Sequence, residues 1–240
     1  MKKGQIALFV IIAILIVSAV GFIVYTQRGA LGIKLAPEQA ETRSITSFIE
    51  SCITSTGENA LFVTGKQGGY YIPPQYAAGS IAYYFYDNKS YMPSKSEIEN
   101  QLSIYLVENL ESCTGNFSMF PDFSIETGKI NSTAKILSNK VSFSVSWHLV
   151  LRKGYVYQLN SFNIEIPSRL SAIYATAEKI TAQQLQSSQI CLSCIIDYAD
   201  ENKVYVSMES IGGNTMLFTI KDNQTLISNQ PYEFTFANKY

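Results

Sequence analysis

The sequence begins with a short basic segment that runs directly into an uncharged apolar stretch, Ile6 to Tyr25. Twenty residues in a helix that rises 1.5 Å per residue span about 30 Å, which matches the hydrocarbon thickness of a bilayer. Lys2 and Lys3 lie on the N-terminal side of this stretch, and the positive-inside bias places that side in the cytoplasm. We therefore expect the rest of the chain to be exported.

Three interpretations of this start differ in the fate of the apolar stretch. A cleaved secretory signal has an apolar region of about 7 to 15 residues and an A-x-A-like cleavage site. Here the apolar run is longer, and Ala30-Leu31-Gly32 is a poor and distant match to such a site. A plain signal anchor needs no further feature. The third interpretation depends on the order Lys2-Lys3-Gly4-Gln5, with the apolar run immediately after it.

This order resembles the class III signal of archaeal type IV pilins and archaellins, over the segment from Lys2 to Tyr25. The resemblance implies that a membrane peptidase cuts between Gly4 and Gln5. It also implies a structural filament subunit, held in the membrane before assembly and then packed against copies of itself through the N-terminal helix. The chain departs from the bacterial pilin pattern at Phe9, where that pattern has a glutamate.

The remaining chain is similar to single-span surface proteins of small-genome archaea, a group with no assigned activity. The similar stretches are Phe48-Ile49-Glu50-Ser51-Cys52, Gly68-Gly69-Tyr70, Cys191-Leu192-Ser193-Cys194 and Pro231-Tyr232-Glu233-Phe234. This resemblance implies a cell-surface location. We therefore divide the chain into a basic leader (1–4), a hydrophobic transmembrane or filament-core helix (5–25), a linker or helix continuation (26–36) and an extracellular α+β domain (37–240).

The composition fits an exported globular domain. Hydrophobic residues make up 47% of the chain, and 16 Tyr and 13 Phe leave enough apolar surface outside the N-terminal helix to bury a core. The formal net charge is -1 and no basic run occurs, which argues against nucleic-acid binding. Because only 15% of the residues are charged, Ser, Thr, Asn and Tyr must supply much of the polar surface.

Apolar residues at helical spacing predict four amphipathic helices after the N-terminal segment. They cover Pro37 to Val63 with an end or kink at Gly57, Lys95 to Cys113 behind a Ser94/Glu97 capping box, Leu170 to Ile180 behind a Ser168 cap, and Cys191 to Ala199. The apolar face of the first helix is expected to pack either on its own domain or, as part of a long spine, on neighbouring subunits.

Strict alternation of apolar and hydroxyl residues from Val141 to Leu151 predicts a strand with one buried face. Turns at 138–140 and 152–154 predict that it pairs with 133–137 and 155–166 as an antiparallel meander. Four more strands are expected, at 81–86, 204–208, 216–220 and 233–236. The alternation of helical and strand segments predicts an α+β fold.

The four cysteines all follow the apolar run, and an even count in an oxidising space favours disulfides. Cys52 and Cys113 each lie near the apolar face of an expected helix, so a bridge between the two helices is expected. That pairing leaves Cys191 and Cys194 for one another. The alternatives for Cys191-x-x-Cys194 are half of a zinc site or a redox pair, and the polar segment before it lacks the strand typical of redox motifs.

The tyrosines around Tyr70, Tyr71 and Tyr76 and the aromatic strand 81–86 are expected to pack in the core and on the sheet. The functional alternative is a surface that binds sugars or partner proteins, because tyrosine presents a large, rigid and amphipathic face.

No catalytic constellation emerges from the sequence. The glycine-rich segment Gly65 to Gly69 lacks the order of a phosphate-binding loop. The single histidine, His148, is expected on the hydroxyl face of its strand, with Ser146 about 6 to 7 Å away, too far for a nucleophile and its base. We expect no enzyme activity, no metal and no cofactor.

Four N-x-[ST] sequons, each near an expected turn or loop, are candidate glycosylation sites at Asn88, Asn116, Asn131 and Asn223. The sequence thus predicts a disulfide-bonded, glycosylated structural subunit of an extracellular filament. The alternative is a permanently anchored, monomeric surface domain that acts as an adhesin or binding module on a host or neighbouring cell.

Overall fold

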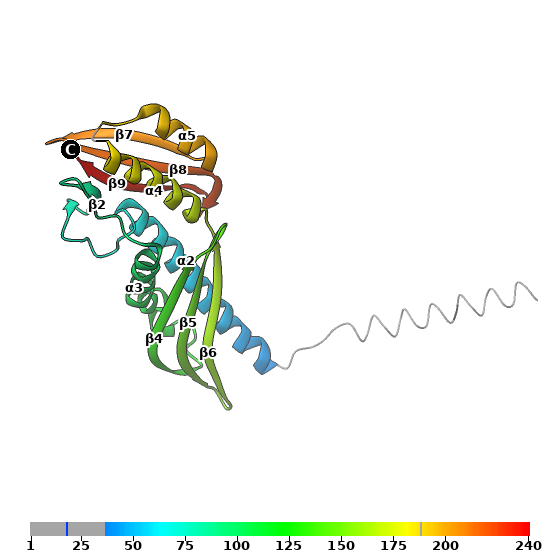
Figure 1. The fold of residues 1–240 in the computed structure, drawn as a ribbon. Coiled ribbons are helices and arrows are strands. Elements are labelled where there is room, and N and C mark those ends of the chain that lie inside the picture. Colours follow the sequence, from blue (N-terminus) through cyan, green and yellow to red (C-terminus); the bar gives the residue numbers. More distant parts are fainter. Residues whose placement is uncertain (1–17, 19–36, 188) are drawn as a thin grey trace, which may run out of the picture. The chain divides into compact units, whose positions relative to one another are not determined.

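A computed structural model describes residue 18, residues 37–187 and residues 189–240. Residues 45–240 form one compact unit, and its helices and strands confirm the expected α+β class (Figure 1). Within the described residues, no helix is both long and apolar enough to span a membrane. The expected leader (1–4) and linker (26–36), and all of the expected apolar helix (5–25) except Ser18, lie outside the described residues.

The described chain forms four α-helices, one short 3-10 turn and two sheets. The helices are α2 (Pro37–Lys66), α3 (Lys95–Thr114), α4 (Leu170–Gln186) and α5 (Leu192–Asn202), and the 3-10 turn is Gly115–Phe117. The first sheet has the order β4 (Ser124–Ile136), β5 (Lys140–Arg152), β6 (Val156–Pro167). The second has the order β1 (Ala77–Ala78), β2 (Ile81–Tyr86), β9 (Gln230–Lys239), β8 (Thr215–Ile227), β7 (Tyr205–Gly212), with β3 (Lys89–Ser90) paired to β2.

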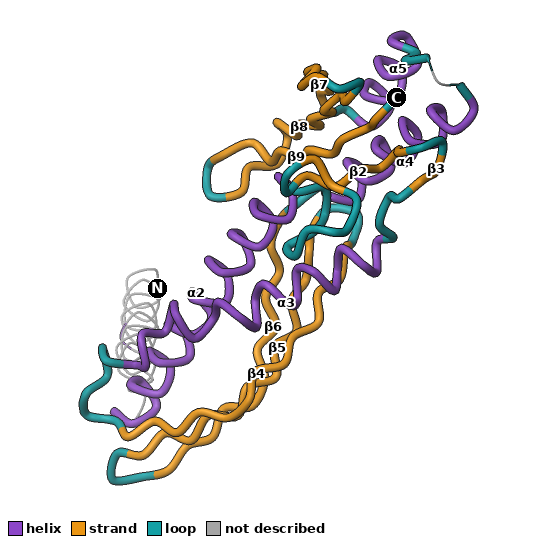
Figure 2. The backbone as a smooth tube through the Cα atoms, turned by 90° about the vertical axis from the view of Figure 1, so that its left-hand side faces the viewer, coloured by secondary structure: helices purple, strands orange, loops and turns teal. Residues whose placement is uncertain are grey.

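The predicted meander is confirmed, since β5 pairs antiparallel with both β4 and β6. Phe143 lies opposite Ala134 on one side and Ile164 on the other. Alternate β5 side chains, including Phe143 and the fully buried Trp147, point into the core, because this face of the sheet is covered by α2 and α3 (Figure 2). The other face carries the hydroxyl side chains of β5 and is exposed.

The prediction that Gly57 ends or kinks the first helix is wrong, because α2 continues through it to Lys66. Gly57 packs directly against the meander: a Cβ at this position would stand 2.7 Å from Ile166 Cδ1. The glycine therefore permits close packing instead of breaking the helix. The apolar face of α2, which includes Ile45, Ile49 and Ile53, is buried within its own domain.

Helix α3 begins as expected and protects one edge of the meander. Ser94 Oγ accepts a hydrogen bond from the Glu97 amide at 3.1 Å, which is one half of the predicted capping box. Further along the helix, Ser103 Oγ accepts from the Ala134 amide at 2.8 Å and the Glu99 carboxylate accepts from the Ile136 amide at 2.9 Å. These bonds satisfy amides on the outer edge of β4, which would otherwise be open to another strand.

The second sheet contains a pairing that the sequence did not predict. Strands β2 and β9 run parallel, with Tyr83 opposite Ala237, and the other pairings in this sheet are antiparallel. The buried Asn238 side chain accepts a hydrogen bond from the Phe85 amide at 3.1 Å, where the register shifts. The core beside β9 is aromatic, with Phe236 stacked between Tyr84 and Phe218.

Arg169 joins three elements at one point. Its Nη1 donates to Asp222 Oδ1 in β8 at 2.8 Å and to the Lys203 carbonyl at 3.2 Å, and its Nη2 donates to the Asn202 carbonyl at the end of α5. The Asp222 side chain is completely buried. Arg169 is also the N-cap residue of α4, the place expected for Ser168, although Ser168 Oγ still accepts from the first helical amide at 3.2 Å.

Candidate functional site

Four tyrosines form a cluster on the surface around β2, and we call Tyr76, Tyr83, Tyr86 and Tyr91 the tyrosine patch. The ring of Tyr76 lies 5.4 Å from that of Tyr86 and 4.4 Å from that of Tyr91, measured between centroids. Tyr83 adds a further ring 5.3 Å from Tyr86. All four rings are partly accessible, with Tyr76 36% exposed, so the patch presents aromatic faces to solvent.

Only part of the tyrosine-rich segment reaches the surface, and its burial does not alternate strictly, because Tyr84 and Phe85 are both buried. Tyr84 points into the core, where its hydroxyl donates to the Gly68 carbonyl at 3.0 Å. Its neighbour Tyr83 points to the other face of the strand. Residues Asp87 and Asn88 then reverse the chain with positive φ angles and lead into β3. The expected core packing therefore holds for Tyr84, and the surface alternative fits the tyrosine patch.

A hollow of about 490 Å³ adjoins the tyrosine patch through Tyr86. Its other lining residues include Asp87, Asn88, Lys239 and Tyr240. Lys239 Nζ stands 5.4 Å from the centroid of the Tyr86 ring, within the range of a cation–π interaction. The hollow thus combines one acidic, one basic and one amide group with aromatic rings, a set that suits a polar ligand with some apolar surface.

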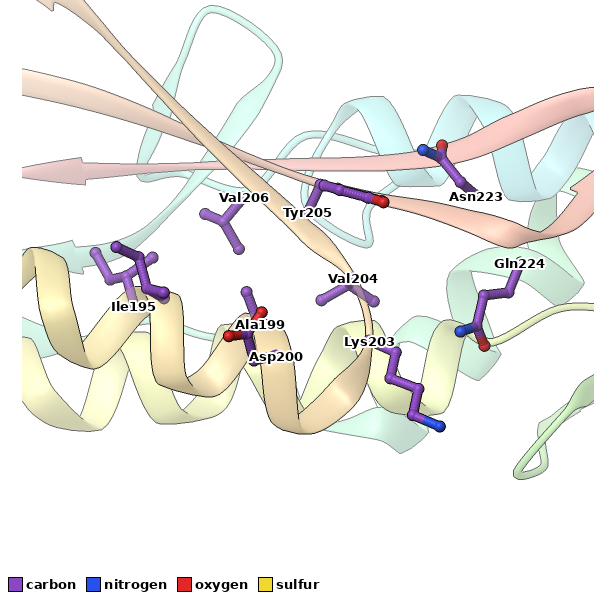
Figure 3. Close-up of a pocket in the computed structure, with 10 residues that line it drawn as sticks. Ile195, Ala199, Asp200, Lys203, Val204, Tyr205, Val206, Asn223 and Gln224 are labelled. Carbon is purple, nitrogen blue, oxygen red and sulfur yellow. The ribbon is translucent and has the colours of Figure 1, made fainter.

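A second hollow, of about 510 Å³, lies between α5 and the start of β7 (Figure 3). Ile195 and Ala199 of α5 face it from one side, and Tyr205 and Val206 of β7 face it from the other. Polar groups complete the lining: Asp200, Lys203, Asn223 and Gln224. This arrangement of an apolar floor with a polar rim suits a short polypeptide segment or a comparably sized ligand.

Both expected disulfides are present. Cys52 and Cys113 join α2 to α3 with 5.6 Å between their Cα atoms, and Cys52 is buried. Cys191 and Cys194 pair with each other at the start of α5, with 5.3 Å between their Cα atoms. Within the described part of the chain, no cluster of three or more His, Cys, Asp or Glu residues is arranged to hold a metal ion.

The four sequons lie on the surface in different local structures. Asn88 is in the turn between β2 and β3, and Asn116 is in the 3-10 turn after α3. Asn131 departs from the expected turn position, because it lies within β4 opposite Ser146. Asn223 lies in β8, where the pairing with β9 is irregular, and lines the hollow beside α5. All four side chains are accessible to a modifying enzyme.

The exposed face of the meander is hydroxyl- and amide-rich, as expected. It contains a shallow hollow of about 250 Å³, whose polar lining residues are Asn131, Ser132, Thr133, Ser144, Ser146, Ser161 and Asn163. His148 lies on β5 and is exposed, and its Nδ1 is 2.6 Å from Asn160 Oδ1. The histidine thus has an amide partner on the neighbouring strand.

Sequence reasoning missed several groups that shape these sites. Lys239, which contacts the tyrosine patch, comes from β9, far along the chain from β2. No sequence pattern marked Asp222 as a buried charge, yet it is the buried partner of Arg169. The glycine-rich segment divides between two structures: Gly65 belongs to α2, whereas Gly68 and Gly69 turn the chain with positive φ angles.

The comparisons with known proteins return no match: no protein-family model, curated protein sequence or solved structure matches this chain.

Proposed function

We propose that the chain is a structural subunit of an extracellular surface filament, similar to archaeal type IV pilins. The observation that carries the proposal is the order Lys2-Lys3-Gly4-Gln5 followed at once by the apolar run from Ile6 to Tyr25. An apolar helix of this length is stable in lipid before assembly and among other helices afterwards, since both environments exclude water. The globular domain then faces outward.

Features of the globular domain support this assignment. The apolar face of α2 is buried inside its own domain, so α2 itself is not the apolar spine that packs on neighbouring subunits, and the proposal assigns that role to the apolar run 6–25. Ser47, Ser51 and Ser55 lie one turn apart on the exposed face of α2, and such small side chains allow a neighbouring subunit to approach closely. The hydroxyl face of the meander suits the exterior of a solvated fibre.

The proposal is tested by blocking the cleavage that it requires. Gly4→Val alters the residue that precedes the expected cut, and Gly29→Val makes the same change in the segment after the apolar run. In an archaeal host with a class III signal peptidase, we expect a mature N-terminus at Gln5 and fibres that contain the wild-type and Gly29→Val proteins, and neither for Gly4→Val. An intact Met1 on the wild-type protein, with no fibre that contains it, overturns the proposal.

The tyrosine patch favours a second function, that of a permanently anchored monomeric surface domain that binds another cell. A cluster of accessible tyrosine rings beside a charged hollow is a common form of recognition surface. We expect Tyr83→Ala/Tyr86→Ala to weaken adhesion of the full-length protein to cells at least tenfold, as for interface residues that contribute over about 1.4 kcal/mol. Tyr155→Ala, which removes a partly accessible tyrosine between β5 and β6 and outside the patch, is the matched control and leaves adhesion unchanged.

A further inference from the structure

We propose that Cys191 and Cys194 form a redox-active pair that exchanges disulfides with cysteine-bearing polypeptides docked beside α5. The proposal rests on the surroundings of the two sulfurs, on how little the fold depends on their bond, and on the apolar surface next to them. It is independent of whether the chain forms filaments.

The start of α5 is arranged to stabilise a negative charge on the Cys191 sulfur. Cys191 is the N-cap residue of this helix, and its Sγ accepts a hydrogen bond from the Cys194 amide at 3.3 Å. The Ser193 hydroxyl lies 3.6 Å from the same sulfur. No acidic residue occupies the first turn of α5. Since the N-terminus of a helix favours anions, these groups stabilise a thiolate at Cys191 when the disulfide is reduced.

The fold depends little on this disulfide. The bond links residues three apart in the sequence, so it closes a very small loop, whereas the Cys52–Cys113 bond links residues 61 apart. Helix α5 is held in place by other groups: Ile195 and Ala199 are buried, and the carbonyls of Asn202 and Lys203 accept hydrogen bonds from Arg169. The protein can therefore keep its structure in both redox states.

The surface around the pair suits a polypeptide substrate. Leu192 is 58% exposed and Ile196 is 60% exposed, one turn apart on the helix that carries both cysteines. Ile196 also lines the hollow between α5 and β7. Tyr205 lines the same hollow and is 64% exposed (Figure 3). Strand β7 is the last strand of its sheet, so an extended segment can pair with its outer edge.

The exchange proceeds in two steps that balance. A thiolate of a partner with two cysteines attacks Cys191 Sγ, the Cys191–Cys194 bond breaks, and Cys194 leaves as a thiolate that takes up a proton. The second partner thiolate attacks the partner sulfur of the mixed disulfide and displaces Cys191 as the stabilised thiolate. Two electrons pass from the partner dithiol to the Cys191–Cys194 pair, and the partner gains a disulfide.

The first test compares the two disulfides under native conditions. The full-length chain, purified in detergent, is treated with dithiothreitol, quenched with an alkylating reagent and analysed by mass spectrometry of its cysteine peptides. We expect Cys191–Cys194 to be reduced at least about tenfold faster than Cys52–Cys113, with the circular dichroism spectrum unchanged. Reduction of both bonds at the same rate, or only together with unfolding, overturns the proposal.

Single variants test the separate roles of the two sulfurs. With a synthetic peptide whose two cysteines form an intramolecular disulfide, the free thiolate of Cys191 in Cys194→Ser attacks the peptide disulfide and should accumulate as a mixed disulfide, with the other peptide sulfur released as a thiol. Cys191→Ser should accumulate much less. The alkylation rate of Cys191 in Cys194→Ser should reach its plateau at lower pH than that of free cysteine. Equal trapping by both variants, or a plateau at the pH of free cysteine, contradicts the assignment.

The docking surface has its own test. Ile196→Asp places a charge on the exposed apolar surface, and Asp197→Ala changes the next exposed residue on the same helix. We expect Ile196→Asp to slow the reaction with the peptide at least about fivefold while the reaction with dithiothreitol is unchanged, and Asp197→Ala to react as the wild type. An equal effect of Ile196→Asp on both reagents rules out a polypeptide site here.

Discussion

The meander with α2 and α3 and the second sheet with α4 and α5 are stabilised in different ways. In the first region, the Cys52–Cys113 bond joins two helices that are distant in sequence. In the second, the structural link between distant elements is the buried ion pair of Arg169 and Asp222, and the disulfide of this region spans only three residues. The disulfide of the first region thus joins two separate helices, whereas the disulfide of the second region joins no separate elements.

The difference separates two uses of cystine within one chain. In the chain-entropy account, closing a loop of about 60 residues stabilises the folded state by about 4 kcal/mol, and closing one of four residues by about 2 kcal/mol. The Cys191–Cys194 bond therefore adds less stability than the Cys52–Cys113 bond, and it lies at a helix that Arg169 already anchors. The presence of a disulfide does not by itself indicate a structural role, and its neighbours decide which role it has.

The largest change in stability should follow removal of the buried carboxylate. Asp222→Ala leaves the Arg169 guanidinium, whose side chain is only 18% exposed, without its partner, which destabilises the fold by as much as about 5 kcal/mol. The adjacent exposed pair, Lys221 with Glu233 at 3.1 Å, provides the control, and Lys221→Ala should change stability by less than about 1 kcal/mol. Urea unfolding measures the free energy of unfolding of both variants. Equal losses would show that the buried ion pair stabilises the second region no more than an exposed pair does.

The next largest effect should distinguish the two disulfides directly. Cys52→Ala/Cys113→Ala should lower the free energy of unfolding by about 4 kcal/mol, because the unfolded chain regains the freedom that the long loop had lost. Cys191→Ala/Cys194→Ala should lower it by less than about 2 kcal/mol. Thermal unfolding of the two double variants tests this order, and the reverse order would show that α5 depends on its own bond.

A smaller effect is expected at the end of α2, where the helix meets the second sheet. Alanine usually stabilises a helix relative to glycine, but a Cβ at Gly65 would stand 2.6 Å from the Glu233 carbonyl oxygen. Gly65→Ala should therefore destabilise the protein by about 1 to 3 kcal/mol. Ser55→Ala, on the exposed face of the same helix, should be neutral or slightly stabilising. A stabilising Gly65→Ala would mean that β9 can move away from α2.

The smallest effect appears only in alkali and concerns the second region. Burial raises the pKa of Tyr232 and of Tyr84 above their usual value. Each neutral hydroxyl therefore contributes stability that is complete below about pH 10, where the unfolded tyrosine ionises, and that is lost as the pH rises further. Tyr232→Phe should move the alkaline unfolding midpoint, followed by circular dichroism, to higher pH and change stability little at pH 7.

Tyr84→Phe provides a contrast for the alkaline experiment. Like Tyr232→Phe, it removes the ionisable hydroxyl of a buried tyrosine. It also removes the hydrogen bond that the Tyr84 hydroxyl donates to the Gly68 carbonyl. We expect it to destabilise the protein at pH 7 by about 1 kcal/mol. An alkaline midpoint that is unchanged in both variants would show that other groups control unfolding at high pH.

The local elements were predictable because their signals are local. The alternation of β5, the Ser94 cap of α3 and the spacing of Leu170 to Ile180 in α4 each depend on neighbouring residues, and the structure confirms them. Gly57 misled the prediction because its role depends on Ile166, a residue over one hundred positions away. Local propensity cannot register such a contact.

The candidate sites were predictable to a lesser degree. Both disulfides followed from helix positions and elimination, whereas the environment of Cys191 needed the actual start of α5. The tyrosine patch was foreseen only as an alternative, because the strand signal does not say which side chains of β2 the rest of the fold covers. Lys239 joins it through the parallel pairing of β2 and β9, which no short-range pattern encodes.

That parallel pairing also determines when each region can form during synthesis. The meander, α2 and α3 are complete once residue 167 has been made. Strand β9 follows every other strand in the chain, yet it lies between β2 and β8 in the middle of its sheet. Until residue 239 emerges, β2 lacks its main partner and β8 has one open edge, so the nascent second sheet is open to unwanted pairing. About 150 residues are therefore synthesised after the aromatic strand β2 before its partner strand β9 can pair with it.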